Sequence, residues 1–193
     1  MTSPRRIIVA MTGATGVVYG IEILRILREL GGFETHLILS TAAIRTLAEE
    51  TDVPLSSVKA LADVLHSFKD IGASIASGSF RTEGMIIAPC SSHTMSAIAA
   101  SLGDNLILRA ADVCLKERRP LLLMLRETPF HLGHIDHMAA VTRYGAIVMP
   151  PVPSFYTRPA TIDEMVRQTA ARALDIIGID PPLLKRWGEG DNV

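Results

Sequence analysis

The feature that most constrains the fold is a repeated alternation between short apolar runs and longer segments with helical periodicity. Apolar runs occur at 7–11, 35–40, 84–90, 120–127 and 146–150. Each run is followed by a turn or loop, and most by a helix-like segment. The runs are apolar on both faces, as strands are when helices cover both sides of a parallel sheet. The sequence therefore predicts an α/β fold with a parallel sheet and helices on both faces.

The intervening segments show where the helices are expected. Their ranges are 17–30, 42–50, 91–103, 106–117, 134–144 and 161–177, and a short helical excursion is expected within 53–68. In the first of these helices, Glu22, Arg25 and Glu29 fall on one face, which we expect to be solvated. A chain of 193 residues fits one domain, so we expect a single domain over 1–193.

Composition narrows the class of protein. The net charge is −1, which gives no reason to expect a nucleic-acid partner. The apolar runs are too short to cross a bilayer, and polar residues interrupt the N-terminal run as no signal peptide would allow. Two cysteines without metal-type spacing suit a reducing compartment. These observations predict a cytoplasmic protein with no membrane association.

The hydrophobic fraction of 48% is high for a protein of this kind and also suggests surface buried between subunits. Trp187, the one tryptophan, stands among polar residues in the C-terminal tail. We therefore expect a large homo-oligomer in which the tail, from about 179 to 193, packs on a neighbouring subunit.

Polar or small residues follow four of the predicted strands. In parallel sheets ligands bind at the carboxyl ends of the strands. The residues at these ends are Thr12 to Gly16, Ser40, Cys90 to Thr94, and Arg126 with Glu127. TGATG is not a GxGxxG motif, and Ser40 stands where a dinucleotide site carries an acid, which argues against NAD. Either an anion site or a simple tight turn explains TGATG taken alone.

The other candidate residues each have a structural alternative. Ser91 can be a helix N-cap, His93 an exposed first-turn residue, and Cys90 a buried thiol rather than a nucleophile. Arg109, Asp112 and Lys116 share a helix face, which predicts either a salt-bridge ladder or a cationic pocket for phosphate.

Residues nearer the C-terminus leave similar choices. Phe155 and Tyr156 lie in a Pro-bounded loop and can form a lid or ordinary loop packing. Arg172 lies beside the apolar stripe of the last helix, so we expect it to have a charged partner. His131, His134 and His137 with Asp136 could be drawn as a zinc site, but no other ligand cluster accompanies them and we expect no metal.

Several longer motifs resemble one known family. MTGATG, LILSTAA, ASGSF, PCSSHT, LILRAADVCLKERRPLLLMLRETP, MPPVPSFYTRP and RWGE occur in that order across nearly the whole chain. In these motifs the chain resembles the UbiX/Pad-type flavin prenyltransferases. The resemblance implies a flavodoxin-like Rossmann fold, FMN binding and a dodecamer. The implied reaction joins a dimethylallyl group from dimethylallyl phosphate to reduced FMN, without a metal, and supplies prenylated FMN to a UbiD-type decarboxylase.

The resemblance also implies roles for individual residues. Those implied to bind the flavin are Gly13, Ala14, Thr15, Ser40, Ser91, Ser92, His93, Thr94 and Arg126. Those implied to bind the prenyl donor are Ser77, Gly78, Arg109, Lys116, Tyr156 and Arg172. Those implied to act in catalysis are Glu50, Lys116, Glu127 and Tyr156.

Three positions depart from the family pattern, and two other functions remain open. Thr15 replaces a Ser, His93 replaces a Lys or Arg, and His137 stands in HIDHM where HLENM is usual. These changes bear on substrate preference, and the sequence does not choose between the monophosphate and diphosphate donors. A flavin-dependent cysteine decarboxylase is one rival, although its PASANT-like segment is replaced by PCSSHT. A non-catalytic FMN-binding subunit of a decarboxylase is the other.

Overall fold

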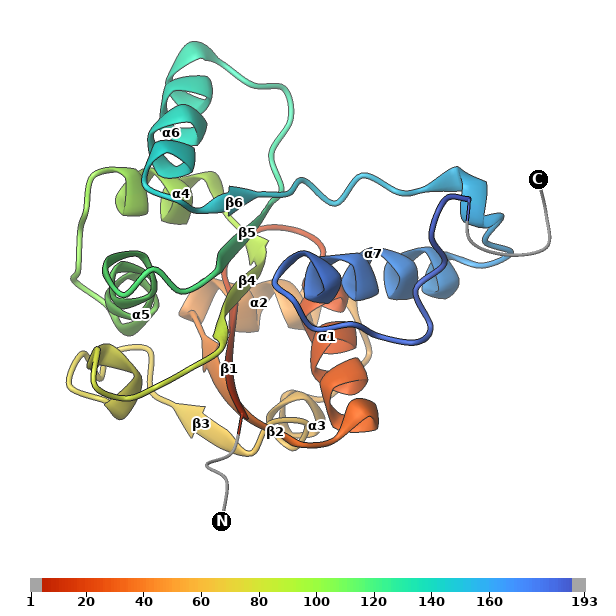
Figure 1. Ribbon diagram of the computed structural model, residues 1–193, viewed down its shortest axis with the longest axis horizontal. Coiled ribbons are helices and arrows are strands. Elements are labelled where there is room, and N and C mark those ends of the chain that lie inside the picture. The colour runs from red at the N-terminus through yellow and green to blue at the C-terminus, as the bar shows by residue number, and fades with distance from the viewer. Residues whose placement is uncertain (1–4, 189–193) are drawn as a thin grey trace.

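A computed structural model of the protein describes residues 5–188 and shows one parallel six-stranded sheet (Figure 1). The strands are β1 (Arg5–Met11), β2 (Phe33–Leu39), β3 (Val64–His66), β4 (Gly84–Cys90), β5 (Leu121–Leu125) and β6 (Ile147–Val148). The α-helices are α1 (Val17–Leu30), α2 (Thr41–Glu50), α3 (Leu55–Lys59), α4 (Ser92–Ala99), α5 (Leu106–Lys116), α6 (Leu132–Arg143) and α7 (Ile162–Ile176). Two 3₁₀ turns, η1 (Ser74–Ala76) and η2 (Phe155–Thr157), lie in the loops.

The strand order is β3-β2-β1-β4-β5-β6, and every pairing is parallel. Without the three-residue edge strand β3, the order of the five remaining strands is that of flavodoxin-like folds. The order reverses between β1 and β4, so the loops after these two strands diverge to opposite sides. The predicted flavodoxin-like Rossmann fold is confirmed, and the β1/β4 junction is where such folds place a ligand.

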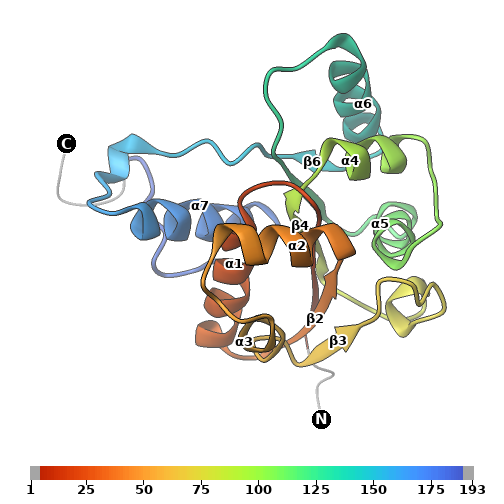
Figure 2. The same ribbon diagram turned by 180° about the vertical axis from the view of Figure 1, so that it is seen from behind.

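Helices cover both faces of the sheet (Figures 1 and 2). Side chains alternate along β1, where Ile7, Val9 and Met11 join the core under α1, α2, α3 and α7. Ile8 and Ala10 join the core under α4, α5 and α6. The same alternation divides β5 between the two cores, and all of β4 is buried. This two-sided burial explains why the strands read as continuous apolar runs.

One expectation about local structure was incomplete and another was wrong. The region 53–68 contains the expected short helix, α3, but also β3, which is too short and too exposed to give a strand pattern. Glu22, expected on a solvated face, has only 8% of its surface exposed. It is covered because α7 packs along α1 and Arg167 reaches across to it, with 2.5 Å between Nη1 and Oε1.

No helix between residues 5 and 188 combines the length and the apolar character needed to cross a membrane.

Candidate functional site

A cavity of about 400 Å³ lies at the carboxyl ends of the strands, beside the β1/β4 junction. It is formed by the loop after β1, the starts of α2, α4 and α5, and the segment after β3. Its lining residues are Thr12, Gly13, Ser40, Thr41, Ala42, Phe68, Ser91, Ser92, His93, Thr94, Asn105, Ile107 and Leu108.

One wall of the cavity consists of two helix N-termini. Ser40 caps α2 by accepting a hydrogen bond of 3.0 Å from the amide of Ala43, and Ser91 caps α4 by accepting one of 3.2 Å from Thr94. The Ser91 and Thr94 hydroxyls lie 3.0 Å apart. Uncapped first-turn amides and helix dipoles favour a bound anion, so this wall suits a phosphate.

Thr12 holds the loops after β1 and β4 in a fixed relation. Its hydroxyl donates to the carbonyl of Pro89 at 2.9 Å and accepts from the amide of Ser91 at 2.8 Å. Gly13 follows, and a Cβ at this position would lie 2.4 Å from Cβ of Ala42. A glycine is therefore required for the loop to pack this closely on α2.

Another part of the lining is apolar and aromatic. Phe68 comes from the segment after β3, while Ile107 and Leu108 come from the first turn of α5. The cavity thus combines a polar, anion-binding wall with an apolar wall of the kind that contacts a planar ring.

Glu50, the last residue of α2, lies at the N-terminus of α1. Its Oε2 accepts hydrogen bonds from the amides of Gly16 and Val17, at 2.8 and 3.2 Å. Gly16 adopts φ 97°, a conformation that favours glycine, and begins α1 without a side-chain cap of its own. The Glu50 carboxylate supplies that cap across 34 positions of sequence.

Arg126 and Glu127 directly follow β5, next to the start of α4. The amide of Arg126 donates to the carbonyl of Cys90 at 3.0 Å. A hydrogen bond from Ser92 and one from the amide of Thr128 hold the pKa of Glu127 below its usual range, and nearby His134 contributes less. Glu127 is therefore ionised at neutral pH and lies beside a residue that lines the cavity.

A second group of predicted residues lies around η1 and the end of α5. A Cβ at Gly78 would be 2.6 Å from Nζ of Lys116, so these two residues are adjacent. Lys116 pairs with Glu117, and the hydroxyls of Ser77 and Ser79 lie 2.9 Å apart. On the same helix, Arg109 pairs with Asp112 at 3.2 Å, which is one pair of the predicted ladder, whereas Lys116 pairs with Glu117 rather than with Asp112.

A third group lies on η2 and on α7, the helix that packs along α1. The segment that contains η2 extends away from the sheet, on the opposite side from α5 (Figures 1 and 2). Tyr156 donates its hydroxyl to the carbonyl of Lys185 at 3.3 Å and meets Trp187 edge-on, with ring centroids 5.4 Å apart. Arg172 has the charged partner expected for it, Asp175. Within one chain, neither Tyr156 nor Arg172 lines the cavity.

The described part of the C-terminal tail folds back on its own α7. Gln168 donates to the carbonyl of Leu183 at 3.0 Å and accepts from the amide of Lys185 at 3.1 Å. Trp187 nevertheless keeps 77% of its surface exposed, as an anchor for a neighbouring subunit would. The expected contact between tail and neighbour stays a prediction, and its last part, 189–193, lies outside the described residues.

The cysteines and histidines take structural positions. Burial raises the pKa of the Cys90 and Cys114 thiols to about 12, so neither is a ready nucleophile. The rings of His131 and His134 have centroids 3.7 Å apart, while Nδ1 of His137 lies 2.8 Å from Oγ of Ser96. Between residues 5 and 188 no three His, Cys, Asp or Glu side chains gather to hold a metal ion.

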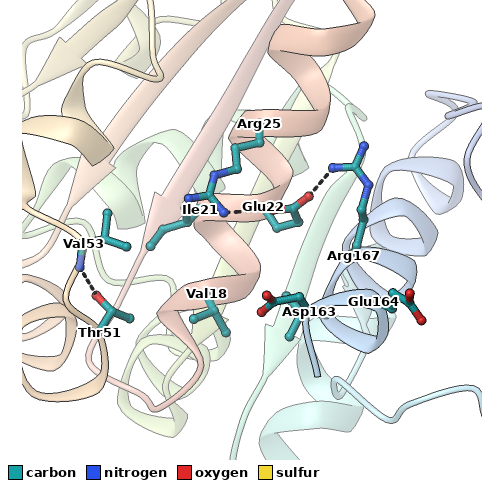
Figure 3. A pocket seen from close by; sticks show the side chains of 10 residues that line it. Val18, Ile21, Glu22, Arg25, Thr51, Val53, Asp163, Glu164 and Arg167 are labelled. Atoms are coloured by element: carbon teal, nitrogen blue, oxygen red, sulfur yellow. Dashed lines mark hydrogen bonds and ion pairs between the residues drawn. The ribbon is translucent and has the colours of Figure 1, made fainter. Parts of the chain in front are cut away.

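Two other hollows hold none of the predicted site residues. One of about 470 Å³ lies between α1 and α7, where Glu22 is paired with both Arg25 and Arg167 (Figure 3). The other, of about 590 Å³, lies at the amino ends of β1 and β4 and is lined by four arginines that include Arg6 and Arg119. Arg6 pairs with Glu34, and Arg119 donates to backbone carbonyls, so both cations are already engaged.

Sequence reasoning missed six residues that line the cavity, namely Thr41, Ala42, Phe68, Asn105, Ile107 and Leu108. Thr41 and Asn105 begin α2 and α5, and a search for N-caps would have found Asn105, whose side chain accepts from Leu108 at 3.2 Å. Phe68 carries no local signal, because it reaches the cavity only through the placement of β3 at the sheet edge.

Comparison with known proteins agrees with this arrangement. Residues 1–173 match the family described as Flavoprotein. The chain is 54% identical over 182 residues to the flavin prenyltransferase UbiX of Thauera aromatica, which covers 94% of this chain and 93% of the relative. It is 52% identical over 185 residues to the flavin prenyltransferase UbiX of Escherichia coli strain K12, covering 95% and 98%.

Solved structures give the same result. The crystal structure of AnUbiX in complex with FMN and dimethylallyl pyrophosphate matches with a TM-score of 0.94 and 47% identity, over 98% of this chain and 100% of that one. A dodecameric FMN-dependent UbiX-like decarboxylase from Escherichia coli O157:H7 matches with a TM-score of 0.91 and 46% identity, over 94% and 98%. The epidermin biosynthesis protein EpiD from Staphylococcus aureus, at 17% identity and a TM-score of 0.58, over 78% of this chain and 85% of that one, shares the fold alone. The chain belongs to the flavin prenyltransferase family of flavoproteins.

Proposed function

We propose that the protein transfers a dimethylallyl group from a dimethylallyl phosphate to reduced FMN. The observation that carries this proposal is the cavity at the β1/β4 junction, whose lining combines two serine-capped helix N-termini with apolar side chains. The AnUbiX structure to which the chain is similar holds FMN and dimethylallyl pyrophosphate.

The residues present fit FMN. A phosphate suits the hydroxyls and amides at the starts of α2 and α4, and the flavin ring suits the wall formed by Phe68, Ile107 and Leu108. The cavity volume of about 400 Å³ is in the range of small-ligand pockets. Gly13, Ser40, Ser91, Ser92, His93, Thr94 and Arg126 are the proposed contacts, with Ala14 and Thr15 on the same loop.

The prenyl donor needs residues that one chain keeps apart. Lys116 with Gly78, Arg109 on α5, Tyr156 on η2 and Arg172 on α7 do not line the cavity. A closed oligomer brings different surfaces of identical chains together. We therefore propose that neighbouring subunits complete the donor site in a homo-oligomer, and that it is a dodecamer like the similar Escherichia coli O157:H7 protein.

The proposed chemistry follows from the residue types. Reduced FMN supplies the nucleophilic ring system that receives the dimethylallyl group, so that prenylated FMN is the product. Arg109, Lys116 and Arg172 stabilise the charge on the departing phosphate. Glu127 holds or moves a proton, and the apolar wall keeps water from the allylic carbon. Glu50 and Tyr156 act beside them in the proposed catalytic set, and no residue is assigned to a metal.

The product is proposed to pass to a UbiD-type decarboxylase. One experiment tests the activity: anaerobic incubation with reduced FMN and either dimethylallyl phosphate or dimethylallyl diphosphate, followed by mass spectrometry of the released flavin. We expect the flavin to gain one isoprenyl unit with at least one donor. An unchanged flavin with both donors, from protein shown to bind FMN, would favour a non-catalytic FMN-binding subunit instead.

A further inference from the structure

A pair of histidines joins the edge strand β3 to its neighbour β2. His36 on β2 has 2% of its surface exposed, and its Nδ1 lies 2.9 Å from Nε2 of His66 on β3. The ring centroids lie 5.2 Å apart and the ring planes are 15° from parallel, as expected for two rings joined end to end by this contact. Nε2 of His36 lies 3.0 Å from Oε1 of Glu34, which also accepts a hydrogen bond of 2.7 Å from Arg6 on β1. One chain of hydrogen bonds therefore crosses three strands.

Arg6 and Glu34 determine which nitrogen atoms carry hydrogens in this series of hydrogen bonds. Glu34 is ionised, because the hydrogen bond from Arg6 holds its pKa below the usual range. A carboxylate only accepts, so Nε2 of His36 carries a hydrogen and, in the neutral ring, Nδ1 accepts from Nε2–H of His66. One added proton on either ring is compatible with this bond. When both rings are protonated, two N–H groups face each other across the same gap and the bond is lost.

Strand β3 leads directly to the cavity. It is three residues long and bonded to β2 alone, and Leu65 at its centre has 47% of its surface exposed. Phe68 follows two residues after His66, lines the cavity, and accepts a hydrogen bond of 3.0 Å from the amide of Leu106 at the start of α5. Phe68 is therefore held from two sides, by the end of β3 and by the start of α5.

We infer that the His36–His66 pair positions Phe68 in the wall of the cofactor cavity, and that protonation of both rings loosens β3 and weakens flavin binding. His36 and His66 are thus positioning residues, and the affinity for flavin falls when the pH becomes mildly acidic. This inference rests on the proposed function in one respect, that the cavity holds FMN.

The electrostatic surroundings set the direction of the effect. Burial first, and then His36, lower the pKa of His66, while the carboxylate of Asp70 opposes them. A histidine with a lowered folded-state pKa stabilises the fold above its unfolded value, about 6.5, and loses that contribution as the pH falls below it. The start of β3 is held differently, by Asp63, whose pKa is lowered chiefly by the amide of Thr35. Asp63 stays ionised over the pH range in which histidine changes charge. The histidine pair is therefore the contact of β3 that changes with pH.

Two substitutions at His66 separate the hydrogen bond from the ring. His66→Gln keeps a group that can donate to or accept from His36 but does not titrate, whereas His66→Phe keeps an aromatic ring without any hydrogen bond. His137→Gln, on α6, removes one imidazole elsewhere as a control. The full-length chain of each is titrated with FMN between about pH 7.5 and about pH 5.5, the range in which histidine changes charge. Amide hydrogen exchange of peptides covering β3 is measured at the same pH values.

We expect wild type and His137→Gln to lose roughly 3- to 10-fold in FMN affinity over this range, with faster exchange in β3. His66→Gln should match wild type at the upper pH and change little on acidification, whereas His66→Phe should be weak and exchange fast at every pH. Equal pH profiles for wild type and His66→Gln in both measurements would overturn the inference while leaving FMN binding intact. Failure of the wild type to bind FMN at any pH would instead count against the proposed function. The exchange data would still show whether β3 loosens on acidification in the wild type but not in His66→Gln.

Discussion

The carboxylate of Glu50 accepts a hydrogen bond of 2.8 Å from the backbone amide of Gly16, although the two residues are 34 positions apart. The contact joins the end of α2 to the start of α1 and so brackets the loop that carries Gly13 and Thr15. A structural role and the proposed catalytic role of Glu50 are therefore both available, and substitution can separate them.

We expect Glu50→Gln to keep the cap, because its amide oxygen still accepts, and to melt within a few degrees of the wild type. Glu50→Ala leaves the α1 amides without this partner, at a cost of about 1 kcal/mol, or about 2–4 °C in Tm for a chain of this size. If Glu50 also moves a proton, Glu50→Gln should lose roughly 10²- to 10⁴-fold in turnover while binding FMN normally. Full activity in a stable Glu50→Gln would leave only the capping role.

Arg172→Ala should bind FMN like the wild type but need far more prenyl donor. Loss of one charge-assisted hydrogen bond to phosphate costs about 1.5–3 kcal/mol, a rise of roughly 10- to 150-fold in the KM for the donor. The fold should persist, because Asp175 keeps its second partner, Arg186, at 2.6 Å. Arg45→Ala, which removes an exposed arginine paired only with Glu49, is the matched control. Loss of FMN with an unchanged donor KM would show that Arg172 serves the flavin.

Glu127→Gln should fold and bind both ligands but turn over slowly, by roughly two to four orders of magnitude. Its pKa is lowered in the ligand-free structure, first by Ser92 and then by the amide of Thr128, so the resting group is a carboxylate. That state is present above the ordinary pKa and is lost as the pH falls through the lowered value. The test compares the single-turnover rate at saturating ligands and the Tm of Glu127→Gln with those of the wild type. A lower Tm with normal single-turnover prenylation would reduce Glu127 to a structural role.

Arg167→Ala should destabilise the fold without changing the site. It leaves the buried Glu22 with Arg25 alone and removes the contact with Glu29, so we expect a loss of about 1–3 kcal/mol in the free energy of unfolding. Arg25→Ala removes a more exposed partner and should cost less. Urea unfolding compares the two variants, and FMN affinity in each should equal that of the wild type. An equal effect of the two substitutions would contradict this account of Glu22.

Light scattering at micromolar concentration should show a species much larger than 20.9 kDa. Because Trp187 is the one tryptophan and is exposed in the single chain, its fluorescence reports on the assembly. We expect emission at shorter wavelength in the oligomer and a shift to longer wavelength on dissociation. A monomer at this concentration would contradict the predicted oligomer.

The predictions from sequence succeeded where local pattern decides the structure. The apolar runs located β1, β2, β4 and β5 because burial on both faces leaves the same signature whatever the neighbours are. β3 was not predicted, because three residues at an exposed sheet edge are too few to show the hydrophobic pattern of a strand. Glu22 was misplaced because its burial depends on α7, which follows it by 140 positions.

The residues of the candidate site likewise fall into those that local sequence predicts and those that depend on long-range contacts. Residues immediately after strands, such as Ser40 and Ser91, reach the cavity because chain direction fixes the edge at which parallel strands end. Phe68 reaches it through long-range pairing, which no local pattern encodes. Lys116 ends α5, and Tyr156 lies in the segment before α7, on the opposite side of the sheet from α5 (Figure 1). Sequence motifs alone could not say how these two residues would meet.

Labelling of the two cysteines can report the opening of the core that surrounds them. Cys90 and Cys114 both belong to the core under α4 and α5, and neither side chain is accessible. Their high pKa leaves almost no thiolate at neutral pH, so thiol reagents should label the closed protein very slowly. The rate of labelling then reports the fraction of molecules in which this core is open, and a bound ligand should slow it exponentially with the free energy of stabilisation that it adds. Ligand binding can thus be followed by mass spectrometry on the unaltered chain, without a dye or an engineered cysteine.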